Sequence, residues 1–554
     1  MLLALLLAAA DPASAYAHVD GAKLASEEAH ARVATVVQAL NDFGMPRSAT
    51  VLMAALAGDP QQSDAVRAAA RAQLATRAAE DTALAQLLLS DQSQPGKLPA
   101  PVAVAIARGH LERALQLAPL EEGAAFEPLV ESTGVQSAPS SAPQPLDKEL
   151  AAEMGLAAAE APVTAAPAPE RRMPAQAQRE LDLARAVAAS VPAGDPAASD
   201  AREVAALAAL ASGDAAAAAK EFMALAELPV RRGDAAAAAR RDKAYLQLAR
   251  LAYQRSDDAL AAKLYQRVGR GAPEWLDALF ESSWAHFRRG EDEKALGNLL
   301  TLHAPFFQER FFPESFILKA LVLYENCRYA DARASIAEFE QRYQPLHDAL
   351  VQVLRGLPGP QAAADLLARG AVGVQQAVPA AAREEVARLE QAADLRAALA
   401  GATELAQEID SIDRRPPPFR SSALVARIAP LARQARARLL ETAGRKLIAR
   451  LDAERTTLRE LLGQSLRLSY EIAGRERALA TSGPDSALIP QARTEPTQIE
   501  EDEELWPFQG EYWRDELGSY RYQLGRRCRR ARAPIQTASQ PASDPAKVAG
   551  TPGN

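Results

Sequence analysis

Residues 281–302 read ESSWAHFRRGEDEKALGNLLTL, and this stretch decides the fold that we predict. It contains a small residue, Ser283, then a turn residue, Gly290, an alanine, Ala295, and two large apolar residues, Leu299 and Leu302. Apolar residues three or four positions apart on both sides of a glycine are typical of two helices joined by a tight turn. The stretch therefore predicts one helical hairpin.

The same residue types return four times between about Ala201 and Pro345. The turn positions are separated by 43, 34 and 37 residues, and they are Gly213, Ser256, Gly290 and Cys327. Small residues stand seven positions before each turn and five positions after it: Ala206, Ala249, Ser283 and Ala320, then Ala218, Ala261, Ala295 and Ala332. Large apolar residues follow each turn by nine and by twelve positions: Phe222, Tyr265, Leu299 and Ile336, then Leu225, Val268, Leu302 and Phe339. Because two helices that cross closely must bring backbone near backbone, the small positions are the ones that face each other.

This pattern resembles the tetratricopeptide repeat, whose period is about 34 residues. Pro229, Pro273 and Pro345 stand near three of the unit ends, as that resemblance implies. One position departs from the family, because Leu225, Val268, Leu302 and Phe339 stand where another alanine is usual, and this implies a looser contact with the next repeat. The resemblance covers about a quarter of the 554 residues.

The predicted fold class is all-α, an α-solenoid of tetratricopeptide-like hairpins followed by a long helical hairpin of coiled-coil type. Hydrophobic residues make up 48% of the chain but aromatic residues only 5%, and much of the apolar content is alanine, which favours helix. We divide the chain into a signal peptide (1–17), a helical solenoid-like domain (18–135), a linker (136–200), the repeat array (201–356), the long hairpin (357–482), an aromatic segment (483–532) and a tail (533–554).

The N-terminal domain carries degenerate echoes of the repeat. Gly44, Ala49, Met53 and Leu56 follow the repeat spacing, and Gly109 with Ala114 gives a weaker match. The linker is rich in Ala, Pro and Ser, which cannot offset the entropy of ordering the chain. A helix at about 176–189 interrupts it, and Leu181, Leu183 and Val187 could cap the array.

The first residues resemble a secretory signal peptide. Leu2 to Ala10 is an unbroken apolar run, and Ala15-Tyr16-Ala17 is an A-x-A-like cleavage site. No basic residue precedes the run, so a helix that is retained and frays at its start is the alternative. The two cysteines, Cys327 and Cys528, allow one disulfide bridge and have no zinc-ligand spacing. No later apolar run approaches the roughly 18 residues of a membrane span, so we expect no transmembrane segment in the mature chain.

Two long helical segments follow the array, at 380–412 and 421–480, and three prolines, Pro416, Pro417 and Pro418, separate them. Apolar residues in both segments alternate steps of three and four, which is the seam of a coiled coil. In the second segment Gly444, Glu454 and Ser465 interrupt this seam. We predict an antiparallel hairpin, and packing of the same residues on the solenoid or on a coiled-coil partner chain is the alternative.

The C-terminal region is aromatic between Trp506 and Tyr520. If Glu511 began a helix, then Trp513, Leu517, Tyr520 and Leu524 would share one face. The stretch is either an anchor on the chain's own solenoid or a docking motif for another protein. The arginines around Cys528 are either a solvated end or a contact for an anionic surface. We expect the tail to be disordered.

No spacing in the sequence indicates catalysis, a cofactor or a metal site. The six histidines form no HExxH motif, and no phosphate-binding or nucleophile-elbow motif occurs. A net charge of -8, with 63 basic and 71 acidic residues, argues against a nucleic-acid partner. We therefore expect a protein that is not an enzyme and has no cofactor.

The resemblance implies that the first helix of each repeat lines a concave face that binds other proteins or peptides. Arginines and aromatic residues are typical of binding hot spots. The candidate positions on this face are Lys243, Arg250, Tyr253, Gln254, Asp277, Phe280, Trp284, Phe287, Arg288, Ile317, Leu321, Tyr324 and Glu325. Packing within their own repeat or under a capping helix is the alternative for Phe287 and Tyr324. In the aromatic segment the candidates are Trp506, Tyr512 and Trp513.

Together, the repeats and the apolar N-terminus resemble exported tetratricopeptide proteins that scaffold envelope assemblies in Gram-negative bacteria, and more weakly those of gliding-motility complexes. This resemblance implies a periplasmic or envelope-associated adaptor in motility, secretion or assembly machinery. An envelope enzyme of the cell-wall hydrolase type, positioned by its solenoid, and a cytoplasmic tetratricopeptide adaptor are the alternatives.

Overall fold

The structure is a computed structural model that describes residues 11–78, 99–118, 173–481, 491–492, 504–524 and 526–527. Apart from one pair of two-residue strands, the regular structure in these ranges is helical, so the predicted all-α solenoid is confirmed. The two strands, β1 (Gln491–Ala492) and β2 (Arg526–Arg527), pair antiparallel.

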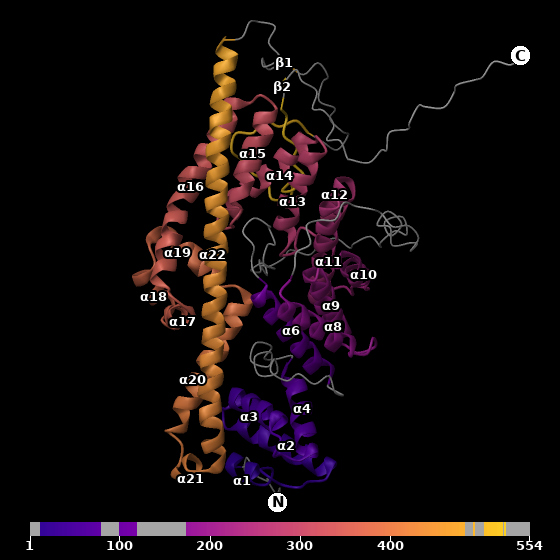
Figure 1. Cartoon of the computed structure of the whole chain (residues 1–554), viewed down its shortest axis with the longest axis vertical. Helices are drawn as coiled ribbons and strands as arrows, with labels where there is room; N and C mark the ends of the chain where they lie inside the picture. The colour runs from indigo at the N-terminus through magenta and orange to yellow at the C-terminus, as the bar shows by residue number, and fades with distance from the viewer. Residues whose placement is uncertain are drawn as a thin grey trace, which may run out of the picture.

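The N-terminal part is a stack of short helices (Figure 1). It consists of α1 (Pro12–Ala17), α2 (Ser26–Asp42), α3 (Pro46–Gly58), α4 (Asp64–Ala78), α6 (Ala100–Leu117) and α8 (Ala175–Ala189). Helix α8 confirms the helix expected at 176–189, and Leu181 is fully buried where α8 packs between α6 and α9. The second echo of the repeat is wrong, because Gly109 lies inside the continuous helix α6 and forms no turn.

Four helical hairpins continue the stack. They are α9 (Ala198–Ala211) with α10 (Ala215–Ala226), α11 (Ala235–Gln254) with α12 (Asp258–Tyr265), α13 (Trp275–Arg288) with α14 (Asp292–Leu302), and α15 (Pro313–Glu325) with α16 (Tyr329–Gly356). A short 3-10 helix, η1 (Pro305–Phe307), lies between α14 and α15.

The repeat pattern has the physical basis that the sequence predicts. The turn positions Gly213, Ser256, Gly290 and Cys327 have φ angles of 81°, 62°, 75° and 58°, a left-handed conformation that ends each first helix. All eight small positions flanking these turns are 0% exposed. The helices of each hairpin therefore cross where the sequence places its small residues.

The chain then forms a second layer of helices. It contains α17 (Pro360–Ala368), α18 (Gly370–Ala377), α19 (Ala380–Glu390), α20 (Ala393–Ile412), the single turn α21 (Pro417–Arg420) and α22 (Ala423–Thr481). Helices α20 and α22 pack together as the predicted hairpin, with the chain reversing at the prolines. The first segment differs from the prediction, because it divides into α19 and α20 at Gln391 and Ala392.

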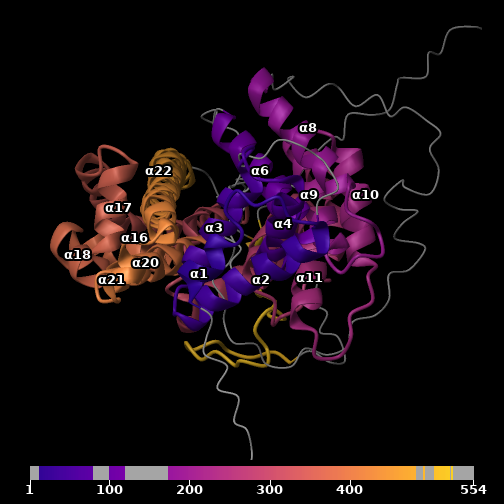
Figure 2. The ribbon, with the colours of Figure 1, turned by 90° about the horizontal axis from the view of Figure 1, so that it is seen from below.

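Helix α22 has 59 residues and joins the two ends of the stack. It contacts α1 and α3 near its start, α17 and α20 along its middle, and α15 and α16 near its end. Figure 2, a view along the long axis, shows α16, α17, α18, α20, α21 and α22 grouped on one side, beside the N-terminal helices and α9 to α11 of the array. Halfway along, Lys446 of α22 forms ion pairs with Glu112 of α6 at 3.1 Å and with Asp394 of α20 at 3.0 Å. The stacked helices and α22 thus form a closed frame.

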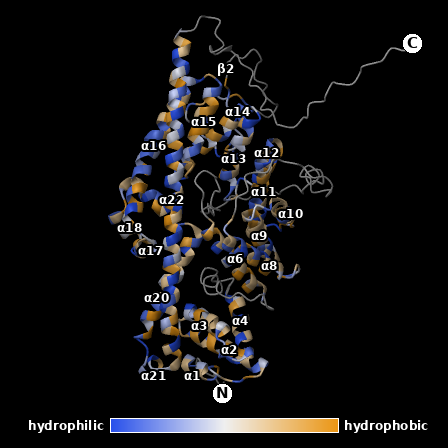
Figure 3. Cartoon of the chain, viewed as in Figure 1, coloured by the Kyte–Doolittle hydropathy of each residue, from blue (hydrophilic) through white to orange (hydrophobic). Residues whose placement is uncertain are grey.

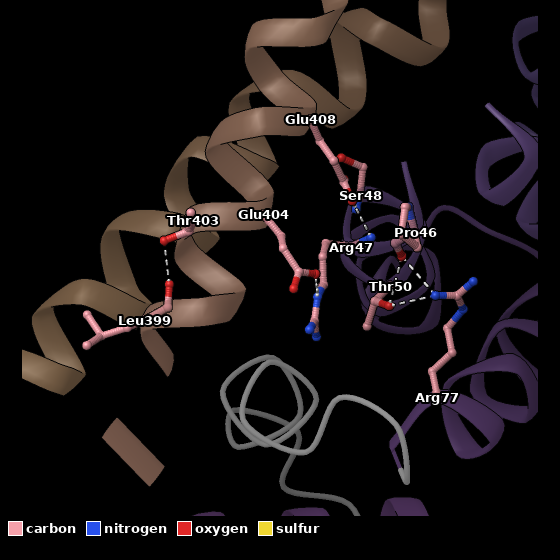
Figure 4. A network of polar contacts seen from close by, with 9 residues as sticks. All are labelled: Pro46, Arg47, Ser48, Thr50, Arg77, Leu399, Thr403, Glu404 and Glu408. Carbon is pink, nitrogen blue, oxygen red and sulfur yellow. Dashed lines mark hydrogen bonds and ion pairs between the residues drawn. The ribbon is translucent and has the colours of Figure 1, made fainter. Parts of the chain in front are cut away.

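A polar contact closes this frame between α20 and α3 (Figure 4). The Glu408 carboxylate accepts hydrogen bonds from the backbone N–H groups of Arg47 and Ser48, both at 2.7 Å, and so caps the N-terminus of α3. Glu404 accepts from the Arg47 Nε at 2.7 Å. Nearby, the Arg415 guanidinium lies 4.2 Å from the Phe43 ring centroid. We call this contact between residues 43–59 and 404–427 the clasp.

The interruptions in the coiled-coil seam each have a structural reason. Gly444 faces the first turn of α17, where an added Cβ would collide with the Pro360 carbonyl oxygen and the Ala364 nitrogen. Ser465 is buried and its Oγ donates to Glu340 Oε1 of α16 at 3.1 Å. Figure 3 shows apolar and polar residues recurring along the length of α22, as expected for a helix that buries one face.

Candidate partner-binding surfaces

The predicted partner-binding residues of the array all lie on α11, α13 and α15, the first helices of three hairpins. We call this set the first-helix row. Phe280, Phe287 and Ile317 are buried at 8%, 7% and 6% exposure, whereas Gln254 and Glu325 are exposed. The remaining eight residues of the row are half-buried: Lys243, Arg250, Tyr253, Asp277, Trp284, Arg288, Leu321 and Tyr324. The row therefore combines residues that pack within the array with residues that a partner can reach.

Arg250 is engaged between two repeats. Its Nε lies 3.0 Å from both carboxylate oxygens of Glu281 on α13, and a further nitrogen lies 2.6 Å from Oε1. The Tyr265 hydroxyl donates to Glu281 Oε2 at 3.0 Å, and burial raises the pKa of Tyr265. A bidentate, half-buried pair of this kind links neighbouring hairpins. Arg250 thus links two neighbouring hairpins, a structural role that its position in the sequence did not indicate.

A second link joins the same two hairpins through Arg288. Its Nε lies 3.2 Å from Asp258 Oδ2, and its guanidinium carbon lies 4.5 Å from the Tyr253 ring centroid. Burial raises the pKa of Tyr253, and the nearby Arg288 acts in the opposite direction. Because both groups remain half-buried, one side of this cation–π pair stays accessible.

At the last repeat the first-helix row meets α22. Leu468 and Ile472 of α22 are 7% and 1% exposed and belong to one apolar cluster with buried residues of α13 to α16. Trp284, Leu321 and Tyr324 pack against this cluster. The Arg475 Nε donates to the Tyr324 hydroxyl at 3.3 Å. The end of α22 therefore occupies part of the row, in agreement with the alternative that Tyr324 packs under another helix.

Three of the four phenylalanines in the α14–α15 connection pack on aromatic residues of the array, and sequence reasoning missed them. Phe307 packs edge-on against Trp275, with centroids 6.1 Å apart, and Phe312 lies 5.8 Å from Phe280. Phe311 lies 6.1 Å from Tyr343, while Phe306 is 45% exposed. The Phe-Phe pairs at 306–307 and 311–312 were the only available signal, because they lie outside the repeat pattern.

The aromatic segment at 504–524, which we call the strap, is irregular and not helical, so the conditional helix from Glu511 is wrong. Its second half is anchored on α14, with Leu517 and Leu524 at 7% and 1% exposure. The Gly518 N–H donates to Thr301 Oγ1 at 2.9 Å and the Tyr522 N–H to the Glu293 carbonyl oxygen at 2.9 Å.

A glycine permits this approach of the strap to α14. An added Cβ on Gly297 would collide with the Tyr520 carbonyl group, so the strap backbone lies directly on the helix. The second half of the strap thus follows the anchor interpretation of the sequence.

The first half of the strap presents its aromatic residues to solvent. Trp506, Phe508 and Trp513 are 54%, 50% and 41% exposed. The Trp506 and Trp513 centroids are 4.8 Å apart, and Phe508 lies 5.2 Å from Tyr512, which is half-buried. These ring pairs lie within the strap, and the docking interpretation stays a prediction for this half.

Cys327, the turn residue of the last hairpin, is buried and disulfide-bonded. The only other cysteine of the sequence is Cys528, which lies outside the described residues. The linker to residue 172, the tail at 533–554 and the arginines after β2 also lie outside the described residues.

One buried ionic cluster joins α19 to α22. Arg388 donates to carboxylate oxygens of both Glu385 and Glu454. Burial, together with the neighbouring Glu385, raises the pKa of Glu454. Two carboxylates that share one guanidinium favour a protonated state of one of them. This ionic cluster explains why Glu454 stands at a seam position of α22, which is the third interruption of the coiled-coil seam.

His303, which is half-buried, has contacts within the array. His303 stacks on Phe316 with centroids 4.1 Å apart, its Nε2 lies 2.8 Å from Ser315 Oγ, and burial lowers the pKa of His303 to about 3. Across the described ranges, no three His, Cys, Asp or Glu side chains are arranged to hold a metal ion. Over the same part of the chain, no helix is both long and apolar enough to cross a membrane.

Comparisons with known proteins add no assignment. No family model matches the sequence, and the search of curated proteins gives no match.

Proposed function

We propose that this chain is a non-enzymatic, tetratricopeptide-type scaffold that holds partner polypeptides on its first-helix row. The observation that carries the proposal is that this row already receives a helix of the chain itself, where Leu468 and Ile472 of α22 join the cluster under Tyr324. Helix-in-groove recognition uses an apolar helix face on such a surface. Toward α11 the row continues with half-buried arginine and aromatic groups, among them Arg250 and Tyr253.

Site-specific photo-crosslinking tests the row. A photoreactive residue at Gln254 or Glu325, both exposed on first helices, should capture partner proteins in native cells. The matched control is Lys220, which is exposed on the second helix α10. Trp284→Ala should weaken capture from Gln254 with unchanged helicity. Equal capture from Lys220, or loss of helicity in Trp284→Ala, would contradict the proposal.

We place the scaffold outside the cytoplasm, in the envelope of a Gram-negative bacterium, possible machineries being motility, secretion or assembly. The apolar run Leu2–Ala10 and the disulfide at Cys327 support export, since disulfides persist mainly in oxidising compartments.

One observation favours the cytoplasmic alternative. Tyr16 is 1% exposed in the N-terminal core, so cleavage after Ala17 would remove a packed side chain. Mass spectrometry of the native N-terminus separates the two locations. A native N-terminus at His18, the start that cleavage after Ala17 produces, supports export, and an intact Met1 with unpaired thiols supports the cytoplasm.

A further inference from the structure

The second half of the strap lies on α14 as an extended chain. Every second strap residue meets a position one helical turn closer to the start of α14: Gly518 at Thr301, Tyr520 at Gly297 and Tyr522 at Glu293. Two residues of extended chain span about 6.6 Å and four residues of helix about 6 Å. The strap therefore follows α14 in the antiparallel direction over about two turns.

Few side chains hold the strap in this position. Across residues 504–524, only Leu517 and Leu524 are buried, and Ser519, Arg521 and Gln523 alternate as exposed residues between half-buried ones. The hydrogen bonds to α14 come from the strap backbone. Because each residue of an ordered segment loses conformational entropy, two anchoring side chains and a few backbone hydrogen bonds leave little net stabilisation.

A disulfide fastens the end of this segment. Cys327 is disulfide-bonded, and since the sequence contains one other cysteine, the bond joins it to Cys528, four residues beyond Leu524. Next to Cys327, the Arg328 Nη1 donates to the Leu524 carbonyl oxygen at 3.2 Å. Tethering a segment at a second point raises its effective concentration at the surface it contacts. The bond therefore favours the strap on α14.

The conformation of Cys327 singles it out among the turn residues. Its φ angle of 58° is left-handed, and two of the other three turn positions of the array are glycines, for which this conformation is not strained. A cysteine held in an unfavourable conformation indicates a role for its sulfur.

The surroundings of the Cys327 sulfur favour its departure as a thiolate. The Tyr329 hydroxyl donates to Sγ at 3.3 Å, and Cys327 stands two residues before the start of α16. A hydrogen-bond donor and a helix N-terminus both stabilise a thiolate. In thiol–disulfide exchange, a sulfur that is stable as a thiolate is the better leaving group. The disulfide is therefore suited to being opened.

We propose that the disulfide at Cys327 is a redox latch for the strap, which a dithiol reductant opens. A thiolate of the reductant attacks the Cys528 sulfur, because Cys327 is only 5% exposed, and the S–S bond breaks with Cys327 leaving as the thiolate. The second thiol of the reductant then displaces the Cys528 sulfur from the mixed disulfide. The two cysteines take up the two thiol protons, and the reductant becomes a disulfide.

Opening the latch changes what the strap and α14 present. The strap keeps its covalent connection through α22, while the surface that it covers becomes exposed. Part of that surface is Trp275, since a Cβ added to Gly518 would lie 2.7 Å from Trp275 Cζ2. The two interpretations of the aromatic segment, anchor and docking motif, then correspond to the disulfide and dithiol states. The latch acts on a second helix, α14, and so goes beyond the first-helix row.

Hydrogen exchange of the full chain tests the latch, with and without dithiothreitol. After reduction, the amides of residues 517–524 should exchange at least about tenfold faster, and trypsin should cleave after Arg521 at least about tenfold faster. Exchange in α10, which the strap does not contact, should stay unchanged. Cys528→Ser should exchange fast without the reductant and show no further increase with it.

Two matched glycine variants separate release of the strap from a general effect on helices. Gly297→Ala places a Cβ against the Tyr520 carbonyl group and should raise exchange at 517–524 while the disulfide is intact, whereas Gly463→Ala, in open space on α22, should not. Unchanged exchange at 517–524 after reduction overturns the proposal, because non-covalent contacts then hold the strap alone. Loss of helicity on reduction also overturns it, because the bond then holds the array itself.

Discussion

The two ends of α22 differ in how the rest of the chain surrounds them. At the lower end, Leu424 and Ile428 are 0% exposed in the N-terminal core, and Arg427 pairs with Asp59. At the upper end, Ile472 is 1% exposed but Tyr470, two residues away, is 83% exposed. One continuous helix therefore closes the frame at its lower end, whereas at its upper end the described residues leave one side of it exposed. Burial on one side is enough to fix a helix in place.

The largest effect is expected at the lower end. Ile428→Ala removes a fully buried side chain from the core shared by α22 and the N-terminal helices, which should cost about 3 kcal/mol of the free energy of unfolding. Hydrogen exchange should then increase in α1 and α3 as well as in α22. Ile472→Ala is the matched change at the upper end, and its increase in exchange should stay within α13 to α16 and the end of α22. An identical exchange pattern in both variants would show that the two ends are not distinct.

Two glycines of α22 should respond to alanine with opposite signs. Gly444→Ala forces a Cβ into the backbone of α17 and should destabilise the protein by about 2 kcal/mol. Gly463→Ala meets open space and should stabilise the helix by about 0.5–1 kcal/mol. Thermal unfolding of both variants measures the difference. A destabilising Gly463→Ala would mean that this side of α22 is covered within the chain.

In the clasp, Glu408 should contribute more to the free energy of unfolding than its neighbour Glu404. Glu408→Ala leaves the backbone N–H groups of Arg47 and Ser48 without their acceptor in a buried contact, which should cost about 2 kcal/mol in chemical denaturation. Glu404→Ala removes an ion pair whose carboxylate side chain is 47% exposed, so its effect should be under about 1 kcal/mol. Equal effects would contradict the capping role of Glu408.

The smallest effect concerns pH and the buried cluster between the two ends. Because the pKa of Glu454 is raised in the folded state, the folded state binds more protons than the unfolded one above the unfolded pKa of about 4.3. Stability from this group should therefore rise as the pH falls through the folded pKa and level off below about 4.3. Glu454→Gln should raise the free energy of unfolding at neutral pH and leave it unchanged at low pH, because the amide carries no charge to bury. A variant with the pH profile of the wild type would show that another group titrates.

The sequence predicts the elements of this fold better than their long-range partners. The turns and small positions of the array follow from local sterics, so Gly213, Ser256, Gly290 and Cys327 could be placed in advance. Gly444, Glu454 and Ser465 could be recognised in the sequence as interruptions of a coiled-coil seam. The contacts that explain them could not be predicted, because the contacting residues lie on other helices, α17, α19 and α16.

The clasp and the strap could not be predicted from spacing at all. Glu408 and Ser48 are 360 residues apart, and no periodicity relates a capping carboxylate to a helix start at that distance. The path of the strap over α14 depends on a single glycine, Gly297, inside an ordinary helical pattern. Of the candidate site, the sequence placed the first-helix row on the correct helices. It gave packing of the second long segment on the solenoid as an alternative, and Leu468 and Ile472 of α22 do pack on the array.

The closed frame has a mechanical consequence. A tensile load applied at the last hairpin reaches α1 and α3 by two routes in parallel, through the stacked helices and along α22. Rupture of one route, such as the contact between α10 and α11, leaves the other intact, so the N-terminal helices and the array stay tethered at a fixed separation. An open solenoid of the same helices would extend under that load, whereas this one resists until the clasp itself parts.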